Sequence, residues 1–251
     1  MAQPGVQNNK QNMGNPSEVA ESIVAILNNN GQSDYIGESI TQLEHCLQTA
    51  HQAQTSGRVY EPLFQCQLTR KLINTKTGGS EELVLAALLH DIGQIIPLEA
   101  TKELRMTSRD SAENVGRVGH EAIGAQYLHS LGFNDAVCQL VKSHVAAKRC
   151  VFLSVPSHTE RLLIMEKRYL TAVNKTYYDS LSSASQKSLR FQGGPFEGEE
   201  LEIFERNPLR DEMVSLRLWD DAAKVVGIED TTPRAASYHD LIVTHLMGQR
   251  K

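Results

Sequence analysis

Residues 83–93 have the sequence LVLAALLHDIG, and this stretch decides the fold. Its first seven residues are apolar at every position, so a helix formed by them is hydrophobic on all sides and belongs at the centre of the molecule. His90 and Asp91 follow this helix directly. Polar groups at the end of a buried helix need partners, because an unpaired buried charge is costly. A site around this pair therefore requires further polar residues from other parts of the chain.

The rest of the chain predicts more helices. No run alternates branched or aromatic residues with a period of two, so no strand is predicted. Apolar residues recur at three- and four-residue steps instead, which indicates amphipathic helices. We expect helices at residues 17–27, 35–53, 83–89, 120–131, 137–144, 184–190 and 211–225. Residues 56–80 are expected to form an irregular excursion or a short helix around 63–72, and residues 101–119 are expected to be loop-like. The predicted fold class is all-α.

Composition limits the domain organisation and the partners. With 251 residues, 40% of them apolar, the chain can form a single domain over residues 17–251. Residues 1–16 are rich in Gln, Asn and Gly and predict a disordered leader. The net charge of -5 without a long basic run argues against a nucleic-acid partner, and no apolar run approaches the length of a membrane span. Four cysteines without a C-x-x-C pair fit a reducing cytoplasm. We expect a cytoplasmic monomer or small homo-oligomer.

Six histidine and aspartate residues on the predicted helices form a candidate metal site: His45, His90, Asp91, His120, His144 and Asp220. A single histidine on an apolar helix face is more often a hydrogen-bonded core residue than a ligand. Four imidazoles and two carboxylates inside one bundle require cations, however, and two ions of the iron class need about this ligand set. Asp91 can bridge two metals with its two oxygens. Donors without a thiolate favour iron, manganese or zinc, and the spacing does not choose among them.

Several segments closely resemble the 2-amino-1-hydroxyethylphosphonate dioxygenase family. These enzymes are mixed-valent di-iron oxygenases of the HD-domain superfamily, related to myo-inositol oxygenase. The likeness extends over residues 34–224 and is carried by DYIGE at 34–38, QLEH at 42–45, LAALLHDIG at 85–93, HVAAKR at 144–149, QGGP at 192–195 and WD at 219–220. The resemblance implies an HD-domain helical bundle with a buried dinuclear metal site, in which the six residues named above bind two irons and Asp91 bridges them.

The resemblance also implies roles for residues around the metals. Tyr35 and Glu38 match a gate, in which the tyrosine occupies an iron position until the substrate arrives and the glutamate contacts the amino end of the substrate. Within the predicted helix at 35–53, Glu38 lies two turns before His45 and shares its face. The residues that match positions around the phosphonate are Lys148, Ser185, Ser188, Gln192 and Arg217. The alternative for Glu38, Lys148 and Arg217 is an ordinary solvated surface charge.

The implied activity is cleavage of the C–P bond of a 1-hydroxyphosphonate to phosphate and a carboxylic acid, with O2 as co-substrate and an Fe(II)/Fe(III) pair as cofactor. Gln94 departs from the family pattern, because a bacterial enzyme of this family has a second histidine at the matching position. Glutamine can hydrogen-bond but cannot carry a proton. The segments at 56–80 and 95–119 are longer than in the family and flank metal-ligand segments. They could reshape the entrance to the site, so the resemblance does not determine the side chain of the substrate. Two alternatives remain: an HD-domain phosphohydrolase acting on a nucleotide or phosphate ester, and a protein with a purely structural metal site.

Overall fold

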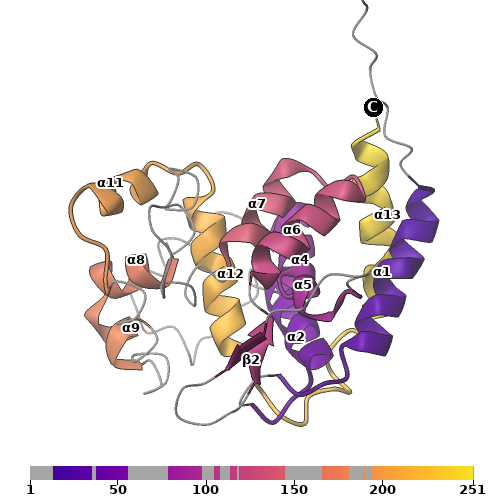
Figure 1. Cartoon of the computed structure of the whole chain (residues 1–251), viewed down its shortest axis with the longest axis horizontal. Helices are drawn as coiled ribbons and strands as arrows, with labels where there is room; N and C mark the ends of the chain where they lie inside the picture. The colour runs from indigo at the N-terminus through magenta and orange to yellow at the C-terminus, as the bar shows by residue number, and fades with distance from the viewer. Residues whose placement is uncertain are drawn as a thin grey trace, which may run out of the picture.

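Helices account for nearly all regular structure in the computed structural model, which describes residues 14–35, 38–55, 79–97, 105–107, 114–117, 119–144, 166–180, 189 and 194–250. The predicted all-α class is confirmed (Figure 1). The helices are α1 (Pro16–Asn30), α2 (Gln42–Thr55), α4 (Glu81–Leu89), α5 (Ile92–Ile95), α6 (His120–Ser130), α7 (Asp135–Ser143), α8 (Glu166–Val173), α9 (Lys175–Ser180), α11 (Glu199–Glu205), α12 (Arg210–Ala222), the 3-10 helix η2 (Ala235–Tyr238) and α13 (His239–Gly248).

Helix α4 lies at the centre of the bundle, as its sequence predicts. All of residues 83–89 are buried. The helix packs against α2, α7, α12 and α13, which surround it in Figure 1. Its first turn is capped by Ser80, whose hydroxyl accepts a hydrogen bond from the backbone N–H of Leu83 at 3.3 Å. His90 follows as the C-terminal cap residue, so the buried helix delivers the His90–Asp91 pair into the interior.

Helix α2 begins at Gln42, and the predicted helix at 35–53 is therefore wrong in its first two turns. The hydroxyl of Thr41 accepts a hydrogen bond from the backbone N–H of Glu44 at 3.2 Å, and so caps the helix. The preceding residues form a turn, in which the Tyr35 backbone N–H donates to the carbonyl of Ile40 at 2.8 Å. Glu38 thus belongs to this turn and does not share a helix face with His45.

A two-stranded antiparallel hairpin lies between α5 and α6, where the sequence predicts a loop. Its strands are β1 (Arg105–Thr107) and β2 (Asn114–Arg117), paired with Arg105 opposite Arg117. The expectation of no strand is wrong here, because strands of three and four residues are too short to show an alternating pattern. The hairpin places the end of β2 next to the start of α6.

The later helices agree in part with the sequence. The predicted helices at 120–131, 137–144 and 211–225 correspond to α6, α7 and α12. Gly132 follows α6 with a φ of 94°, a conformation that favours glycine, and ends that helix. Of the predicted helix at 184–190 only Leu189 is described. Helices α8, α9, α11 and α13 were not predicted, and α13 packs along α1 (Figure 1).

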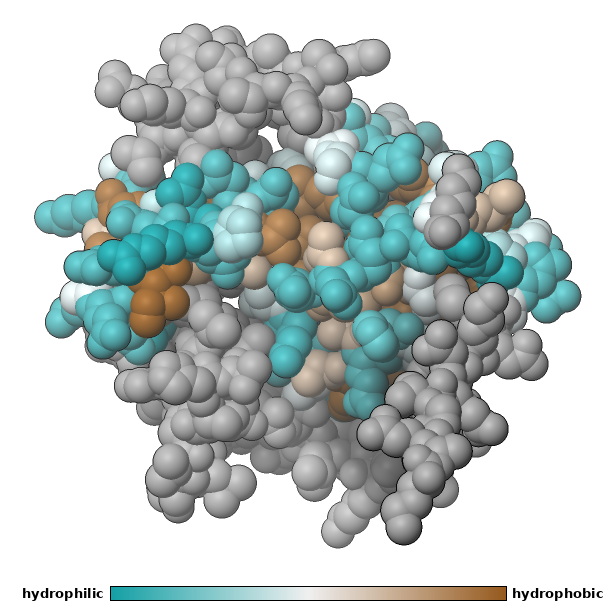
Figure 2. Space-filling model, turned by 90° about the horizontal axis from the view of Figure 1, so that it is seen from above, coloured by the Kyte–Doolittle hydropathy of each residue, from teal (hydrophilic) through white to brown (hydrophobic). Residues whose placement is uncertain are grey.

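None of the described helices is long and apolar enough to cross a bilayer. On the face shown in Figure 2, hydrophilic residues surround smaller hydrophobic groups. Residues 1–13 lie outside the described part, so the disordered leader stays a prediction, as do the single domain, the cytoplasmic location and the oligomeric state.

Candidate metal centre

The four predicted histidine ligands are all oriented in the same way by backbone carbonyls. In each ring the Nδ1 atom lies within hydrogen-bond distance of a carbonyl oxygen, which can only accept, so Nδ1 carries the proton and Nε2 is free. The pairs are His45 with Ala223 at 2.9 Å, His90 with Ala87 at 2.8 Å, His120 with Arg117 at 3.0 Å and His144 with Val141 at 2.5 Å. The unprotonated nitrogen of every ring is thereby available to a metal.

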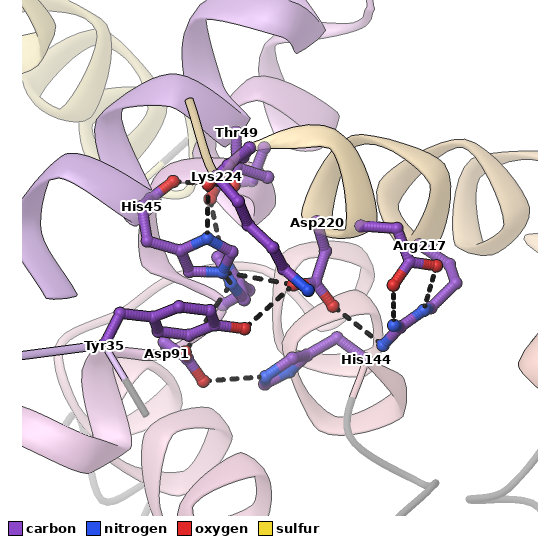
Figure 3. A network of polar contacts seen from close by, with 12 residues as sticks. Tyr35, His45, Thr49, Asp91, His144, Arg217, Asp220 and Lys224 are labelled. Atoms are coloured by element: carbon purple, nitrogen blue, oxygen red, sulfur yellow. Dashed lines mark hydrogen bonds and ion pairs between the residues drawn. The ribbon is translucent and has the colours of Figure 1, made fainter. Parts of the chain in front are cut away.

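These Nε2 atoms converge on the two predicted carboxylates. The Nε2 atoms of His45 and His90 lie 3.0 Å apart, and that of His45 lies 3.1 Å from Asp220 Oδ1. On the other side, Asp91 Oδ1 lies 3.0 Å from His120 Nε2 and 3.1 Å from His144 Nε2. Asp91 Oδ2 faces His90, 3.8 Å away. The two oxygens of Asp91 therefore face two different histidine groups, as Figure 3 shows in part.

The donor set fits metal ions. All six side chains are buried. Two groups, His45 with His90 and Asp220, and His90 with Asp91 and His144, each have donor atoms within 4.8 Å of one another. The two free Nε2 lone pairs at 3.0 Å would repel each other, and a cation between them removes that repulsion. Imidazole and carboxylate donors without a thiolate are typical of iron, manganese and zinc sites.

The protonation states also suit metal binding. Burial lowers the pKa of His90 to about 4, so its ring is neutral at neutral pH. Burial alone would raise the pKa of Asp91, but the imidazoles around it, His90 first, hold that pKa well below its usual range. The Arg217 guanidinium overcomes burial in the same way at Asp220 and keeps the pKa of that carboxyl well below its usual range. Both carboxylates are ionised and ready to bind cations.

Gln42 and Arg217 hold the two carboxylates; Arg217 was predicted as a phosphonate contact, whereas Gln42 was not predicted as a site residue. The Gln42 side-chain amide donates to Asp91 Oδ2 at 2.6 Å. Arg217 donates to Asp220 Oδ2 at 2.8 Å and also pairs with Asp221, to which the Tyr177 hydroxyl donates at 2.8 Å. Gln42 lies three residues before His45 in α2, and this helical spacing could have identified it. Nothing in the sequence distinguishes Tyr177 from the other tyrosines of the chain.

The predicted gate residues lie beside the histidine cluster. The Tyr35 ring stacks on the His45 ring with centroids 3.8 Å apart, and its hydroxyl lies 3.5 Å from Asp220 Oδ1 (Figure 3). Burial raises the pKa of Tyr35, so this hydroxyl is protonated and donates to the carboxylate. Glu38 is half-exposed and pairs with Lys224, whose Nζ lies 3.6 Å from its Oε1 and 5.9 Å from the centre of the Tyr35 ring. Lys224 was not predicted.

The predicted phosphonate contacts are mostly beyond the described residues: Lys148, Ser185, Ser188 and Gln192. Arg217 is described, and its side chain is 13% exposed. Its guanidinium is bound by the carboxylates of Asp220 and Asp221, so it lies at the metal centre and is not a solvated surface charge. Its contact with a substrate stays a prediction.

Comparison with known proteins identifies the family. The HD domain matches residues 43–162. The chain is 36% identical over 224 residues to hydroxymethylphosphonate dioxygenase of Gimesia maris, covering 89% of this chain and 86% of that protein. It is 33% identical over 229 residues to [1-hydroxy-2-(trimethylamino)ethyl]phosphonate dioxygenase (glycine-betaine-forming) of Leisingera caerulea, covering 91% and 89%. The chain belongs to the HD-domain phosphonate dioxygenases. An uncharacterized protein of Acanthamoeba polyphaga mimivirus is 29% identical over 216 residues.

Membership in the HD-domain phosphonate dioxygenases agrees with the geometry. Five of the six candidate ligands fall within the matched HD segment, and Asp220 reaches the cluster from α12, beyond it. The chain is therefore an oxygenase that has a metal-binding site and acts on a small-molecule phosphonate.

Proposed function

We propose that the protein is a dinuclear-iron dioxygenase that cleaves the C–P bond of a 1-hydroxyphosphonate to give phosphate and a carboxylic acid. One observation carries this proposal: Asp91 turns its two oxygens toward two separate histidine groups. A carboxylate in that position can bridge two metals, whereas a mononuclear site has less use for it. The six residues His45, His90, Asp91, His120, His144 and Asp220 are the proposed ligands.

Two bound irons would supply a Lewis acid for the substrate oxygens and a binding site for O2. The overall reaction is balanced without another reductant: hydroxymethylphosphonic acid and O2 have together the atoms of formic acid and phosphoric acid. The protein's own contribution is to present four imidazoles and two ionised carboxylates in fixed positions. The carbonyls that accept from Nδ1 prevent the rings from turning, and Gln42 and Arg217 do the same for the carboxylates.

Tyr35 and Glu38 are the proposed gate. The Tyr35 hydroxyl, next to Asp220 Oδ1, can reach the metal position held by His45 and Asp220. Its ring stacks on His45 and has Lys224 Nζ 5.9 Å from its centre, and Tyr35 itself lies outside the helices, so the ring can leave without breaking the helix core. Glu38, half-exposed and paired with Lys224, would contact the part of the substrate that lies farthest from the metals.

The substrate class follows from the relatives. The names of both characterised relatives, hydroxymethylphosphonate dioxygenase and [1-hydroxy-2-(trimethylamino)ethyl]phosphonate dioxygenase, specify a hydroxyl on the carbon bonded to phosphorus. We infer that this chain also acts on such a carbon, with Lys148, Ser185, Ser188, Gln192 and Arg217 around the phosphonate dianion. Charge-assisted hydrogen bonds from cationic and hydroxyl donors are the interactions that a dianion requires.

The test combines metal analysis with two product assays. The purified protein is analysed for iron, and O2 uptake and phosphate release are measured with hydroxymethylphosphonate, 2-amino-1-hydroxyethylphosphonate and its trimethylammonium analogue. The proposal predicts two irons per chain, an EPR signal of a coupled Fe(II)/Fe(III) pair, and one O2 consumed per phosphate released. Phosphate release from a phosphate ester under argon, with no O2 uptake on any hydroxyphosphonate, would contradict the dioxygenase proposal and support the alternative of an HD-domain phosphohydrolase.

A further inference from the structure

The four carbonyls that orient the histidine rings are not fixed in the same way. Those of Ala87 and Val141 belong to α4 and α7, where the helix itself holds them. That of Ala223 belongs to the C-terminal cap of α12, whose N–H donates to Trp219. The carbonyl of Arg117, which accepts from His120, belongs to the short strand β2. A strand of four residues does not by itself hold a carbonyl as firmly as a helix does.

Arg117 supplies its own anchor. Its side chain is buried, and its guanidinium NH1 donates to the carbonyls of Gly93 at 2.6 Å and Ile96 at 3.0 Å. These carbonyls lie at the C-terminal end of α5, where a helix leaves its carbonyls without helical partners. The backbone N–H of Arg117 donates to Gln94 Oε1 at 2.8 Å. One residue is therefore fixed at three points to the four-residue helix α5 and its C-terminal cap residue.

The same helix also sets Asp91. Asp91 is the N-terminal cap residue of α5, and its Oδ1 lies 3.0 Å from His120 Nε2. The backbone of His120 meets α5 directly, because a Cβ on Gly93 would lie 1.9 Å from the His120 carbonyl oxygen. Thus α5 holds Asp91 at one end and, through Arg117, the His120 ring at the other. The distance between a bridging carboxylate and its histidine partner depends on these contacts.

We propose that Arg117, tethered by Gln94, is a positioning residue for the metal centre: it fixes the carbonyl that keeps His120 in the Nδ1–H tautomer with Nε2 directed at Asp91. The inference rests on the proposed dinuclear site. It also assigns a role to Gln94, which orients the chain through its amide oxygen and needs no proton for that task.

The test uses Co(II), a probe with visible absorption, added to the metal-free protein under argon so that it is not oxidised. The variants are Arg117→Ala, Arg117→Lys and Gln94→Ala, and the matched control is Arg206→Ala, whose side chain is 79% exposed. We expect two Co(II) equivalents in the wild-type chain and the control. In Arg117→Ala the second equivalent should bind about 10- to 100-fold more weakly, the usual cost of removing an outer-sphere partner. In Arg117→Lys the ammonium group can reach one of the two carbonyls, so the affinity for the second Co(II) should lie between those of the wild-type chain and Arg117→Ala.

A second readout excludes a merely structural role. Nitrogen NMR of the metal-free protein, recorded at a pH high enough for the imidazoles to be neutral, distinguishes the two tautomers, and the His120 resonances are identified with His120→Gln. We expect the Nδ1–H tautomer of His120 in the wild-type chain and a mixture in Arg117→Ala and Gln94→Ala, while the other three ligand rings keep theirs. Gln94→Ala keeps the buried guanidinium and thus serves if Arg117→Ala does not fold.

The outcomes separate the inference from the proposed function. If the wild-type chain binds a single Co(II), the dinuclear site itself is wrong. If the wild-type chain binds two and both Arg117→Ala and Gln94→Ala match it in affinity and in the His120 tautomer, the dinuclear site stands and the role of Arg117 is rejected.

Discussion

Asp91 is the residue on which both halves of the proposed metal centre depend. Its Oδ1 faces His120 and His144, while its Oδ2 faces His90 and accepts from Gln42. Helix α4 brings it to this place, because the helix is buried from Leu83 onward and ends at the pair His90–Asp91. A single side chain thus joins two groups of ligands that come from five different helices or helix ends.

Replacing Asp91 by Ala should abolish binding of both irons. The variant loses the only carboxylate that faces both histidine groups among the described residues, and leaves Gln42 without its acceptor. Iron per chain, measured after reconstitution under argon, should fall from two to fewer than one. Asp240→Ala is the matched control, since that carboxylate is fully exposed. A variant that still holds two irons would contradict the bridging role.

Arg217 balances the charge of two adjacent carboxylates and is not an ordinary surface cation. It pairs with Asp220 and Asp221, so Arg217→Met leaves two adjacent carboxylates without their counter-charge. Removing one partner of a buried ion pair costs about 3–5 kcal/mol. We expect a loss of this order in the free energy of unfolding of the metal-free protein, measured with urea. Arg206→Met removes an exposed ion pair with Glu202 and should lower the free energy of unfolding by less than about 1 kcal/mol.

The opposite pattern would reassign Arg217. If Arg217→Met unfolds at the wild-type urea concentration but raises the KM for hydroxymethylphosphonate, its main contact is with the substrate phosphonate. A change in both quantities would show that one guanidinium serves the ligand carboxylate and the substrate together.

At the scale of elements, the close approach of α5 and α6 depends on Gly93. A Cβ at this position would lie 1.9 Å from the carbonyl oxygen of His120 and 2.8 Å from the backbone nitrogen of Gly124. Backbone atoms cannot move aside as a flexible side chain can, so Gly93→Ala must separate the two helices. Overpacking costs about 1–3 kcal/mol, occasionally more, and we expect at least the upper end of that range.

Gly248→Ala is the matched control for this prediction. It lies at the end of α13, with nothing within 4 Å of the added Cβ. Alanine is the better helix former by about 1 kcal/mol, so the control should be neutral or slightly stabilising. Urea unfolding of the metal-free variants measures both effects. Equal stabilities for Gly93→Ala and Gly248→Ala would show that α5 and α6 can separate freely.

The sequence predicts elements best where the apolar pattern is long. Helix α4, apolar at seven successive positions, is buried at all of them. The start of α2 was missed because Ile36 and Ile40 continue the helical spacing, whereas Thr41 followed by Glu44 is a capping motif that ends the pattern. Helix α13 was missed although Tyr238, Ile242 and Leu246 recur every four residues and are buried. The hairpin was too short for any periodic pattern.

At the scale of the whole molecule, the order of the ligands along the chain carried the prediction of the site. The succession His, His-Asp, His, His, Asp on successive helices indicated one cluster, and all six side chains do converge. The sequence could not show what orients them. The partners of the rings are backbone carbonyls, and any residue type supplies a carbonyl, so neither Ala223 nor Arg117 has a recognisable pattern. Such contacts become visible only when distant elements are in place.

Because the ligands come from distant elements, metal binding should stabilise the entire bundle. The cluster joins α2, the end of α4, α6, the end of α7 and α12, which span residues 42–222. A ligand that binds only the folded state at 100 times its Kd adds about 2.7 kcal/mol, which is about 5–10 °C in Tm for a chain of this size. Chelation of the iron should lower the Tm, measured by calorimetry, by that amount, and added Fe(II) should restore it.

The position of Asp220 makes this prediction specific. It is the proposed ligand contributed by α12, and Arg217 neutralises it when no metal is present. In Asp220→Asn the metal can no longer tie α12 to α2 through a carboxylate, so the Tm difference between iron-loaded and chelated protein should shrink to less than half. Asp230→Asn, exposed in the turn after α12, should keep the full difference. An unchanged difference in Asp220→Asn would mean that the ions are held by the histidines and Asp91 alone, with α12 outside the metal centre.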